Sequence, residues 1–194
     1  MKRLILFDFD GTLTYKDSLT AFFKFAYQDE FRYQYYFRLA FHLVLLKLKL
    51  IDYNSLKEKR IKNLISFFSA EDLKSISKSF RDNELPGMLK QSALAQIDKY
   101  KKDENNEFVI VSASLDILLT DWAKSFNMQL ITNELLIGEI PYKHKNDCNF
   151  GQKVIRIKEV YNLDDYSEII AYGDSEGDRE MLEMADIGYF DYFK

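Results

Sequence analysis

The chain has 194 residues, of which 47% are hydrophobic, with seven glycines and two prolines. This composition is typical of a folded domain and excludes a disordered or fibrous chain. A formal net charge of −4 gives no support for nucleic-acid binding. The single cysteine, Cys148, cannot form an internal disulfide, and aspartates interrupt the first apolar run too early for a signal peptide. We therefore expect a cytoplasmic protein with one core domain and at most a smaller insertion.

The first predicted element is a strand over residues 4–7, an uninterrupted apolar run typical of a strand buried on both faces of a parallel sheet. Asp8 and Asp10 follow it one residue apart, before Gly11 and Thr12. In a strand that continues through them, both carboxylates lie on the same face. Two like charges so close together need a cation or a shared proton. Taken alone, the stretch also fits an ordinary Asp-Gly turn.

Residues 16–85 carry helical patterns and no convincing strand. Asp17 or Ser18 can cap the first helix, and a capping box at Ser69 starts a later one. Two further helices are predicted between them, over residues 33–50 and 52–68. We therefore predict a helical cap over residues 16–85, inserted into a core that consists of residues 1–15 and 86–194.

After Pro86 the pattern alternates between helices and strands. Helices are predicted over residues 88–101, 116–126, 154–161 and 179–185, strands over residues 108–111, 130–131, 169–172 and 187–189, and a hairpin around Gly138. Strands that alternate with helices predict an α/β fold, with a doubly wound parallel sheet.

Polar residues directly follow three of the buried strands. Asp8 and Asp10 follow the first, Ser112 follows the second at the expected start of a helix, and Asp174 follows the third. Parallel strands bring their carboxyl ends to one sheet edge, where α/β proteins bind ligands. Hydroxyls and helix N-termini favour phosphate, and clustered carboxylates favour Mg²⁺. One such residue alone is more simply a cap or a turn, but three at one edge predict a site for both.

The motifs at residues 8–14, 112–114, 153 and 173–178 resemble, in combination and order, the four motifs of the haloacid dehalogenase superfamily. The predicted helical insertion resembles the cap of the phosphoserine-phosphatase-like branch. Ser112-Ala113-Ser114 differs from the Ser-Gly-Gly usual in phosphoserine phosphatases, and it is closer to a functionally mixed group of small cap-bearing hydrolases.

The resemblance implies a phosphatase that works through an aspartyl-phosphate. Asp8 would attack phosphorus, and Asp10 would protonate the leaving alcohol and then activate water. Dehalogenases of the superfamily lack the second aspartate, so Asp10 favours a phosphate ester as substrate. The implied cofactor is Mg²⁺, held by Asp8, by the backbone carbonyl of Asp10 and by Asp174.

The resemblance also implies the roles of residues around these aspartates. Ser112 and Lys153 would bind the phosphoryl group, and Thr12 is a further candidate for phosphate contact. Asp178 would orient a metal-bound water or Lys153. Arg60 falls near an arginine that contacts substrate in phosphoserine phosphatases, although a solvated surface charge is the alternative for it.

Lys153 is assigned by its position in the third motif. The glycine before it is two residues away, where relatives carry it three residues away. Lys143, Lys145 and Lys158 are nearby alternatives, which we expect to be solvated like most lysines.

Residues 31–51 form a basic and aromatic segment with four basic residues and no acidic one. Its charges exclude a transmembrane helix. An interfacial helix would give peripheral membrane contact and let the cap reach a phospholipid headgroup. The simpler expectation is a cap helix whose apolar side packs on the other cap helices. A basic cap would also attract an anionic substrate.

A phosphomonoesterase acting on a small phosphorylated metabolite is therefore the predicted function. The alternatives for the substrate are a phospholipid or lysolipid headgroup at the membrane surface, and phosphoserine. A phosphoaccepting receiver-like domain is the non-enzymatic alternative, but its phosphorylated aspartate ends a central strand of a shorter domain without a large insertion. The first strand is not followed by a dinucleotide-binding glycine pattern, which disfavours an oxidoreductase.

Overall fold

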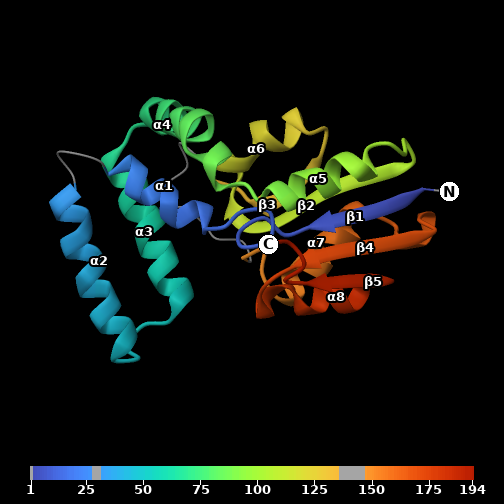
Figure 1. Cartoon of the computed structure of the whole chain (residues 1–194). Helices are drawn as coiled ribbons and strands as arrows, with labels where there is room; N and C mark the ends of the chain where they lie inside the picture. The colour runs from blue at the N-terminus through green and yellow to red at the C-terminus, as the bar shows by residue number, and fades with distance from the viewer. Residues whose placement is uncertain (1, 28–31, 136–146) are drawn as a thin grey trace.

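The structure is a computed structural model that describes residues 2–27, 32–135 and 147–194. Its centre is a five-stranded parallel sheet with the strand order β3-β2-β1-β4-β5 (Figure 1). The strands are β1 (Arg3–Phe7), β2 (Asn106–Leu115), β3 (Gln129–Asn133), β4 (Glu168–Gly173) and β5 (Ile187–Phe190). The predicted α/β fold with a parallel sheet is confirmed.

Helices cover both faces of the sheet, because the central strand is apolar on both sides. Ile5 and Phe7 belong to one hydrophobic cluster, which includes residues of α5 (Gln91–Tyr100) and α6 (Asp116–Ser125). Leu4 and Leu6 belong to a second cluster, which includes residues of α7 (Gly151–Val160) and α8 (Arg179–Met184). Successive side chains of a strand point to opposite faces. The continuous apolar run therefore produces the doubly wound arrangement.

Four helices follow β1 before the chain returns to the sheet. They are α1 (Ser18–Ala26), α2 (Arg32–Lys47), α3 (Tyr53–Phe67) and α4 (Ala70–Asn83), followed by the short 3₁₀ helix η2 (Leu85–Met88). Asp17 caps α1, and Ser69 forms the expected capping box with Asp72. Figure 1 shows α2 and α3 extending away from the sheet, while α4 lies beside α6. The division into a cap at residues 16–85 and a core stays a prediction.

Two local expectations were wrong. β2 continues to Leu115, so Ser112 lies within a strand and not at a helix N-terminus, although α6 begins at Asp116 as predicted. β1 ends at Phe7, and the chain turns after Phe9, so Asp8 and Asp10 do not share a strand face. The expected hairpin around Gly138, and Lys143 and Lys145 with it, lie outside the described residues.

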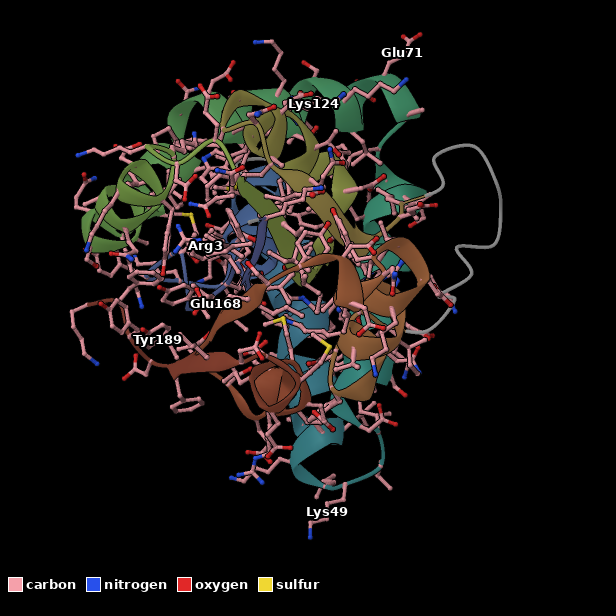
Figure 2. All side chains as sticks on the ribbon, turned by 90° about the vertical axis from the view of Figure 1, so that its right-hand side faces the viewer. Arg3, Lys49, Glu71, Lys124, Glu168 and Tyr189 are labelled. Carbon is pink, nitrogen blue, oxygen red and sulfur yellow. The ribbon has the colours of Figure 1, made fainter. Side chains whose placement is uncertain are left out.

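The predicted site residues lie at only one end of the sheet. Figure 2 looks onto the end where the strands begin, and Arg3 of β1 lies next to Glu168 of β4 there. Two more 3₁₀ turns, η3 (Leu163–Asp165) and η4 (Glu176–Asp178), flank β4. The predicted catalytic and metal-binding residues follow the strands at the opposite end, the carboxyl edge of the sheet.

Candidate active site

A pocket with a volume of about 320 Å³ lies at the carboxyl edge of the sheet. The Asp8 amide donates to the carbonyl of Tyr172 at 2.9 Å, which extends the β1–β4 pairing by one residue and carries Asp8 to the sheet edge. The pocket is lined by residues from the strand ends and from the helical insertion, among them Asp8, Asp10, Asp17, Lys57, Arg60, Ser112, Asp147, Lys153 and Ser175.

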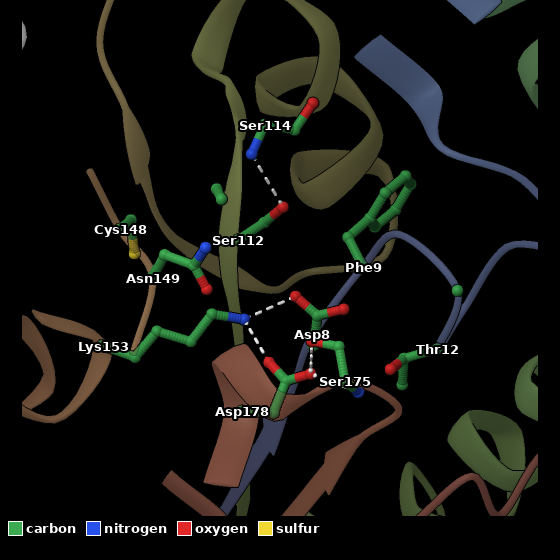
Figure 3. A network of polar contacts seen from close by, with 12 residues as sticks. Asp8, Phe9, Thr12, Ser112, Ser114, Cys148, Asn149, Lys153, Ser175 and Asp178 are labelled. Carbon is green, nitrogen blue, oxygen red and sulfur yellow. Dashed lines mark hydrogen bonds and ion pairs between the residues drawn. The ribbon is translucent and has the colours of Figure 1, made fainter. Parts of the chain in front are cut away.

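A buried lysine joins two carboxylates at the floor of this pocket. Lys153, in the first turn of α7, is 2% exposed, and its Nζ lies 2.5 Å from Oδ1 of Asp8 and 2.6 Å from Oδ1 of Asp178 (Figure 3). Burial alone would lower the pKa of Lys153, but the charges of Asp8 and Asp178 outweigh it and raise that pKa. Lys153 is therefore a fixed positive charge beside Asp8.

Removal from water raises the pKa of Asp8 to about 7, even though the charge of Lys153 lowers it. Nearby Asp178 and Asp174 add to the increase. Three carboxylates, those of Asp8, Asp174 and Asp178, therefore lie close together, and Lys153 pairs directly with two of them.

Asp178 orients both the lysine and the loop after β4. Its Oδ2 accepts hydrogen bonds from the amide and hydroxyl of Ser175, at 3.0 and 2.8 Å, and from the amide of Asp174 at 3.2 Å (Figure 3). Burial would raise the pKa of Asp178, but Lys153 and the Ser175 hydrogen bonds lower it overall. Asp178 therefore stays ionised as the counter-ion of Lys153.

The carboxylates form the basis of a candidate metal site. Oxygens of Asp8, Asp174 and Asp178 all lie within 4.8 Å of one another. The hydroxyl of Thr12 donates to Oδ1 of Asp174 at 2.9 Å, so Thr12 orients a carboxylate in this structure. Burial raises the pKa of Asp174. A group of carboxylate oxygen donors fits a hard cation such as Mg²⁺.

Gly11 makes the close approach of the two loops possible. It has a φ of +83°, and a Cβ placed on it would collide with Oδ2 of Asp174. Its carbonyl accepts a hydrogen bond from Nζ of buried Lys90, which also donates to the carbonyl of Phe193. Any side chain at position 11 would displace the Asp174 carboxylate.

Asp10 is held in place by a hydrogen bond from the start of α1. Its Oδ1 accepts the amide of Ser18, the first residue of α1, at 2.6 Å. Removal from water and the nearby charge of Asp17 raise the pKa of Asp10 to about 8, against the lowering effect of the Ser18 hydrogen bond. A carboxylic acid that is protonated at neutral pH is suited to donate a proton to a leaving group.

Ser112 lies in the pocket wall, on the end of β2. It is 1% exposed, and its Oγ accepts the amide of Ser114 at 3.1 Å (Figure 3). The Ser114 hydroxyl in turn lies 3.0 Å from the hydroxyl of Ser18. The second motif therefore connects the strand end to the first residue of α1.

A family model described as haloacid dehalogenase-like hydrolase matches residues 5–183. The chain belongs to this family. It is 29% identical to Protein CicA of Caulobacter vibrioides, over 94% of this chain and 83% of that protein. The structure is similar to that of a Bordetella pertussis Tohama I protein of unknown function, with a TM-score of 0.80 and 20% identity, over 98% of this chain and 89% of that one.

A second solved structure is that of a phosphoserine phosphohydrolase-like protein from Francisella tularensis. It matches with a TM-score of 0.63 and 22% identity, over 98% of this chain and 86% of that one. The predicted superfamily membership is therefore confirmed, and the fold is that of phosphoserine-phosphatase-like proteins.

This haloacid dehalogenase-like protein has one basic pocket residue that the sequence analysis did not identify. Lys57, on α3, is buried, and its Nζ donates to the carbonyl of Ala113 at 2.8 Å and to Oδ1 of Asp147 at 2.8 Å. The burial of Lys57 is not evident from the sequence, because the residues that follow it are also charged. The available signal was helical spacing, because Lys57 shares a stripe with the buried Ile61 and Leu64.

Arg60 also comes to the pocket from α3. Its guanidinium carbon lies 4.2 Å from the centroid of the Phe23 ring, a distance typical of a cation–π contact. The helical insertion therefore brings two basic side chains, Lys57 and Arg60, to a site that is otherwise rich in carboxylates.

Proposed function

We propose that this protein is a Mg²⁺-dependent phosphomonoesterase that forms an aspartyl-phosphate on Asp8. The observation that carries the proposal is the contact between Lys153 and Asp8 at 2.5 Å, buried at the floor of a pocket that also contains Asp10 and Ser112. A lysine there would attract a phosphoryl group to the oxygen that attacks it. The substrate proposed is a small phosphorylated metabolite, since the pocket volume is about 320 Å³.

In the first step an ionised oxygen of Asp8 attacks phosphorus, and the bond from phosphorus to the substrate oxygen breaks. Asp10 gives its proton to that oxygen, which leaves as an alcohol. In the second step Asp10, now a carboxylate, takes a proton from water as the water oxygen attacks phosphorus. Phosphate leaves, and the Asp8 carboxylate is regenerated.

Ser112 and Lys153 support both steps from the pocket wall. The Ser112 hydroxyl would donate to a phosphoryl oxygen, and the charge of Lys153 would compensate the negative charge of the transferring group. Lys153 keeps its proton throughout, because Asp178 remains its counter-ion. Asp178 is therefore proposed to orient Lys153.

The residues present fit Mg²⁺, because oxygens of Asp8 and Asp174 lie close together. The proposed ligands are Asp8, Asp174 and the backbone carbonyl of Asp10. When bound, the ion would offset repulsion between the phosphate and Asp8 and would lower the pKa of Asp8. Thr12, which donates to Asp174, is proposed to position this ligand.

Arg60 is proposed to contact the part of the substrate that is not transferred. It lines the pocket from the helical insertion, opposite the residues of the sheet edge. Phosphoserine is a second candidate substrate, because Arg60 could pair with its carboxylate and the Francisella protein named phosphoserine phosphohydrolase-like shares the fold.

Hydrolysis of a generic aryl phosphate tests the mechanism. The wild type is measured with Mg²⁺ and with EDTA, beside Asp8→Asn and, as a matched control, Asp82→Asn, an exposed aspartate of α4 that pairs with Lys78. We expect turnover only with Mg²⁺, its loss in Asp8→Asn, and wild-type turnover in the control. Equal turnover by the wild type and Asp8→Asn would overturn the mechanism, and undiminished turnover in EDTA would overturn the metal. A panel of phosphorylated metabolites, phosphoserine and lysophospholipids then ranks substrates by kcat/KM.

A further inference from the structure

A stripe of large apolar side chains on α2 is open to solvent. Its members follow one another at helical spacing, and they are Tyr33, Phe37, Phe41, Val44 and Leu48, exposed by 86%, 79%, 58%, 55% and 62%. Residues spaced by three and four positions lie on one face of a helix. The Leu48 amide donates to the Val44 carbonyl at 2.9 Å, so the helical path continues to Leu48. We call these five residues the bare stripe.

The opposite side of α2 already has a partner. Leu39 packs against the main hydrophobic cluster, and the Arg38 guanidinium lies 5.1 Å from the ring of Phe67 on α3. Figure 1 shows α2 as the outermost helix, beside α3. The expected packing of α2 on another cap helix is present on this side, but α2 is apolar on two sides, and the bare stripe on the second side is exposed.

The bare stripe is not part of a generally apolar surface. Eight of the large hydrophobic side chains that the described residues leave exposed lie between positions 33 and 50. The others are spread over a loop, α7 and the end of the chain: Tyr15, Phe150, Ile155, Val160, Phe190 and Tyr192. A contiguous apolar patch of this kind marks an interaction surface.

The charges around the bare stripe indicate what covers it. Residues 32–50 contain four basic residues and no acidic one, in a chain whose formal net charge is −4. Lys47 follows Val44 by three positions, and Lys49 lies in the connection between α2 and α3, at the lower end of the molecule in Figure 2. An anionic surface would attract this end of the molecule and repel the acidic remainder, which fixes the orientation.

We propose that α2 docks this protein on an anionic lipid surface, with the bare stripe in the interfacial region and Lys47 and Lys49 against the headgroups. Apolar side chains flanked by lysines, with no acidic residue between them, are the composition of interfacial helices. Within the described ranges no helix is long and apolar enough to cross a membrane, and the docking is peripheral. A second copy of the chain fits less well, because pairing two such helices brings only basic residues together.

Vesicle co-sedimentation of the full chain tests the proposal. The probes are vesicles of phosphatidylcholine alone and of phosphatidylcholine with phosphatidylglycerol. We expect binding to the anionic vesicles that weakens with salt. One basic residue near such a surface contributes roughly a fivefold factor in affinity, so Lys47→Gln/Lys49→Gln should bind on the order of twentyfold more weakly. Phe37→Ser/Phe41→Ser should lose at least about tenfold, because the apolar area that enters the interface is smaller.

The matched control is Ile155→Ser/Val160→Ser, which removes apolar residues on α7 that are 49% and 64% exposed. It should bind like the wild type. Asp8→Asn should also bind like the wild type, so docking and catalysis are judged separately. Circular dichroism establishes that all variants are folded, and aryl phosphate turnover confirms it for every variant except Asp8→Asn.

Three results would overturn the proposal. The first is that the wild type does not sediment with anionic vesicles at low salt. The second is that Phe37→Ser/Phe41→Ser binds as tightly as the wild type. The third is that light scattering detects a lipid-free dimer of the wild type, that Phe37→Ser/Phe41→Ser is monomeric, and that neither protein binds vesicles. A second copy of the chain would then cover the bare stripe.

Discussion

Replacing Asp8 by asparagine should stabilise the metal-free protein, and by an amount that depends on pH. The pKa of Asp8 is about 7 in the folded protein because burial disfavours its charge, whereas an unfolded aspartate has a pKa of about 3.9. Above pH 4 the unfolded state is ionised, and the folded state still holds a proton. The ionisation of Asp8 therefore costs stability progressively as pH rises through this window, and the cost levels off above about pH 7.

The magnitude follows from the difference between the two pKa values. A shift of about three units corresponds to about 4 kcal/mol once both states are ionised. Part of this cost is already present at pH 5, so the stability difference between variant and wild type should grow by about 2–3 kcal/mol between pH 5 and pH 8. For a chain of this length that is about 4–12 °C in Tm.

Thermal unfolding of both proteins in EDTA, at half-unit steps from pH 5 to pH 8.5, measures this difference. The asparagine side chain of the Asp8→Asn variant is uncharged at every pH, so the wild-type curve alone carries the Asp8 titration. A Tm difference that does not change with pH would refute the argument that burial outweighs Lys153 at Asp8. Addition of Mg²⁺ should raise the Tm of the wild type more than that of Asp8→Asn, because a ligand bound only by the folded state stabilises it.

Three further substitutions test other parts of the site. Asp10→Asn should lower kcat by about 10²–10⁴ and should remove the loss of wild-type activity expected as pH rises through about 8, where the acid deprotonates; a pH–rate profile with an unchanged alkaline limb would contradict this. Lys153→Met should lower the free energy of unfolding at pH 7 by about 3–5 kcal/mol because it leaves Asp178 buried and unpaired, and a urea titration that gives less than 1 kcal/mol would argue against this pairing. Lys57→Met should cost about 1–3 kcal/mol, whereas its matched control on α3, Lys62→Met, loses only an exposed ion pair and should cost less than about 0.5 kcal/mol; equal effects in urea titrations would show that the buried contact of Lys57 adds nothing.

The sheet could be predicted from the sequence because its information is local. Apolar runs such as residues 4–7 and 169–172 end in polar residues, and these mark the carboxyl edge without knowledge of any contact. The predicted positions of Asp8, Ser112 and Asp174 at one edge needed only the rule that parallel strands align. The true end of β2 was missed because Ser112 and Ala113 are poor indicators of a strand. The pairing of β2 with β3 breaks after Val111 and resumes only at Leu115, which pairs with Asn133.

The contributions of the helical insertion could not be predicted in the same way. Lys57 is charged and lies among other charges, and its burial depends on Ala113 and Asp147, which are 56 and 90 residues away. Periodicity also fails on α2, because a helix that is apolar on both sides has no single face to detect. Which side α3 covers is decided by packing, and this left Phe37 exposed and Leu39 half-buried.

The second carboxylate at Lys153 would explain how one lysine can serve the proposed nucleophile, Asp8, while the charge of that nucleophile changes. In the proposed mechanism Asp8 must be ionised to attack, and afterwards its oxygen is esterified to phosphorus. If Asp8 were the sole counter-ion of Lys153, loss of the Asp8 charge would leave the positive charge of Lys153 unpaired, although that side chain is only 2% exposed. Asp178, whose pKa is lowered and whose other oxygen is held by Ser175, keeps its charge at every stage. In the proposed mechanism Lys153 can therefore remain protonated and in place while Asp8 is phosphorylated and regenerated.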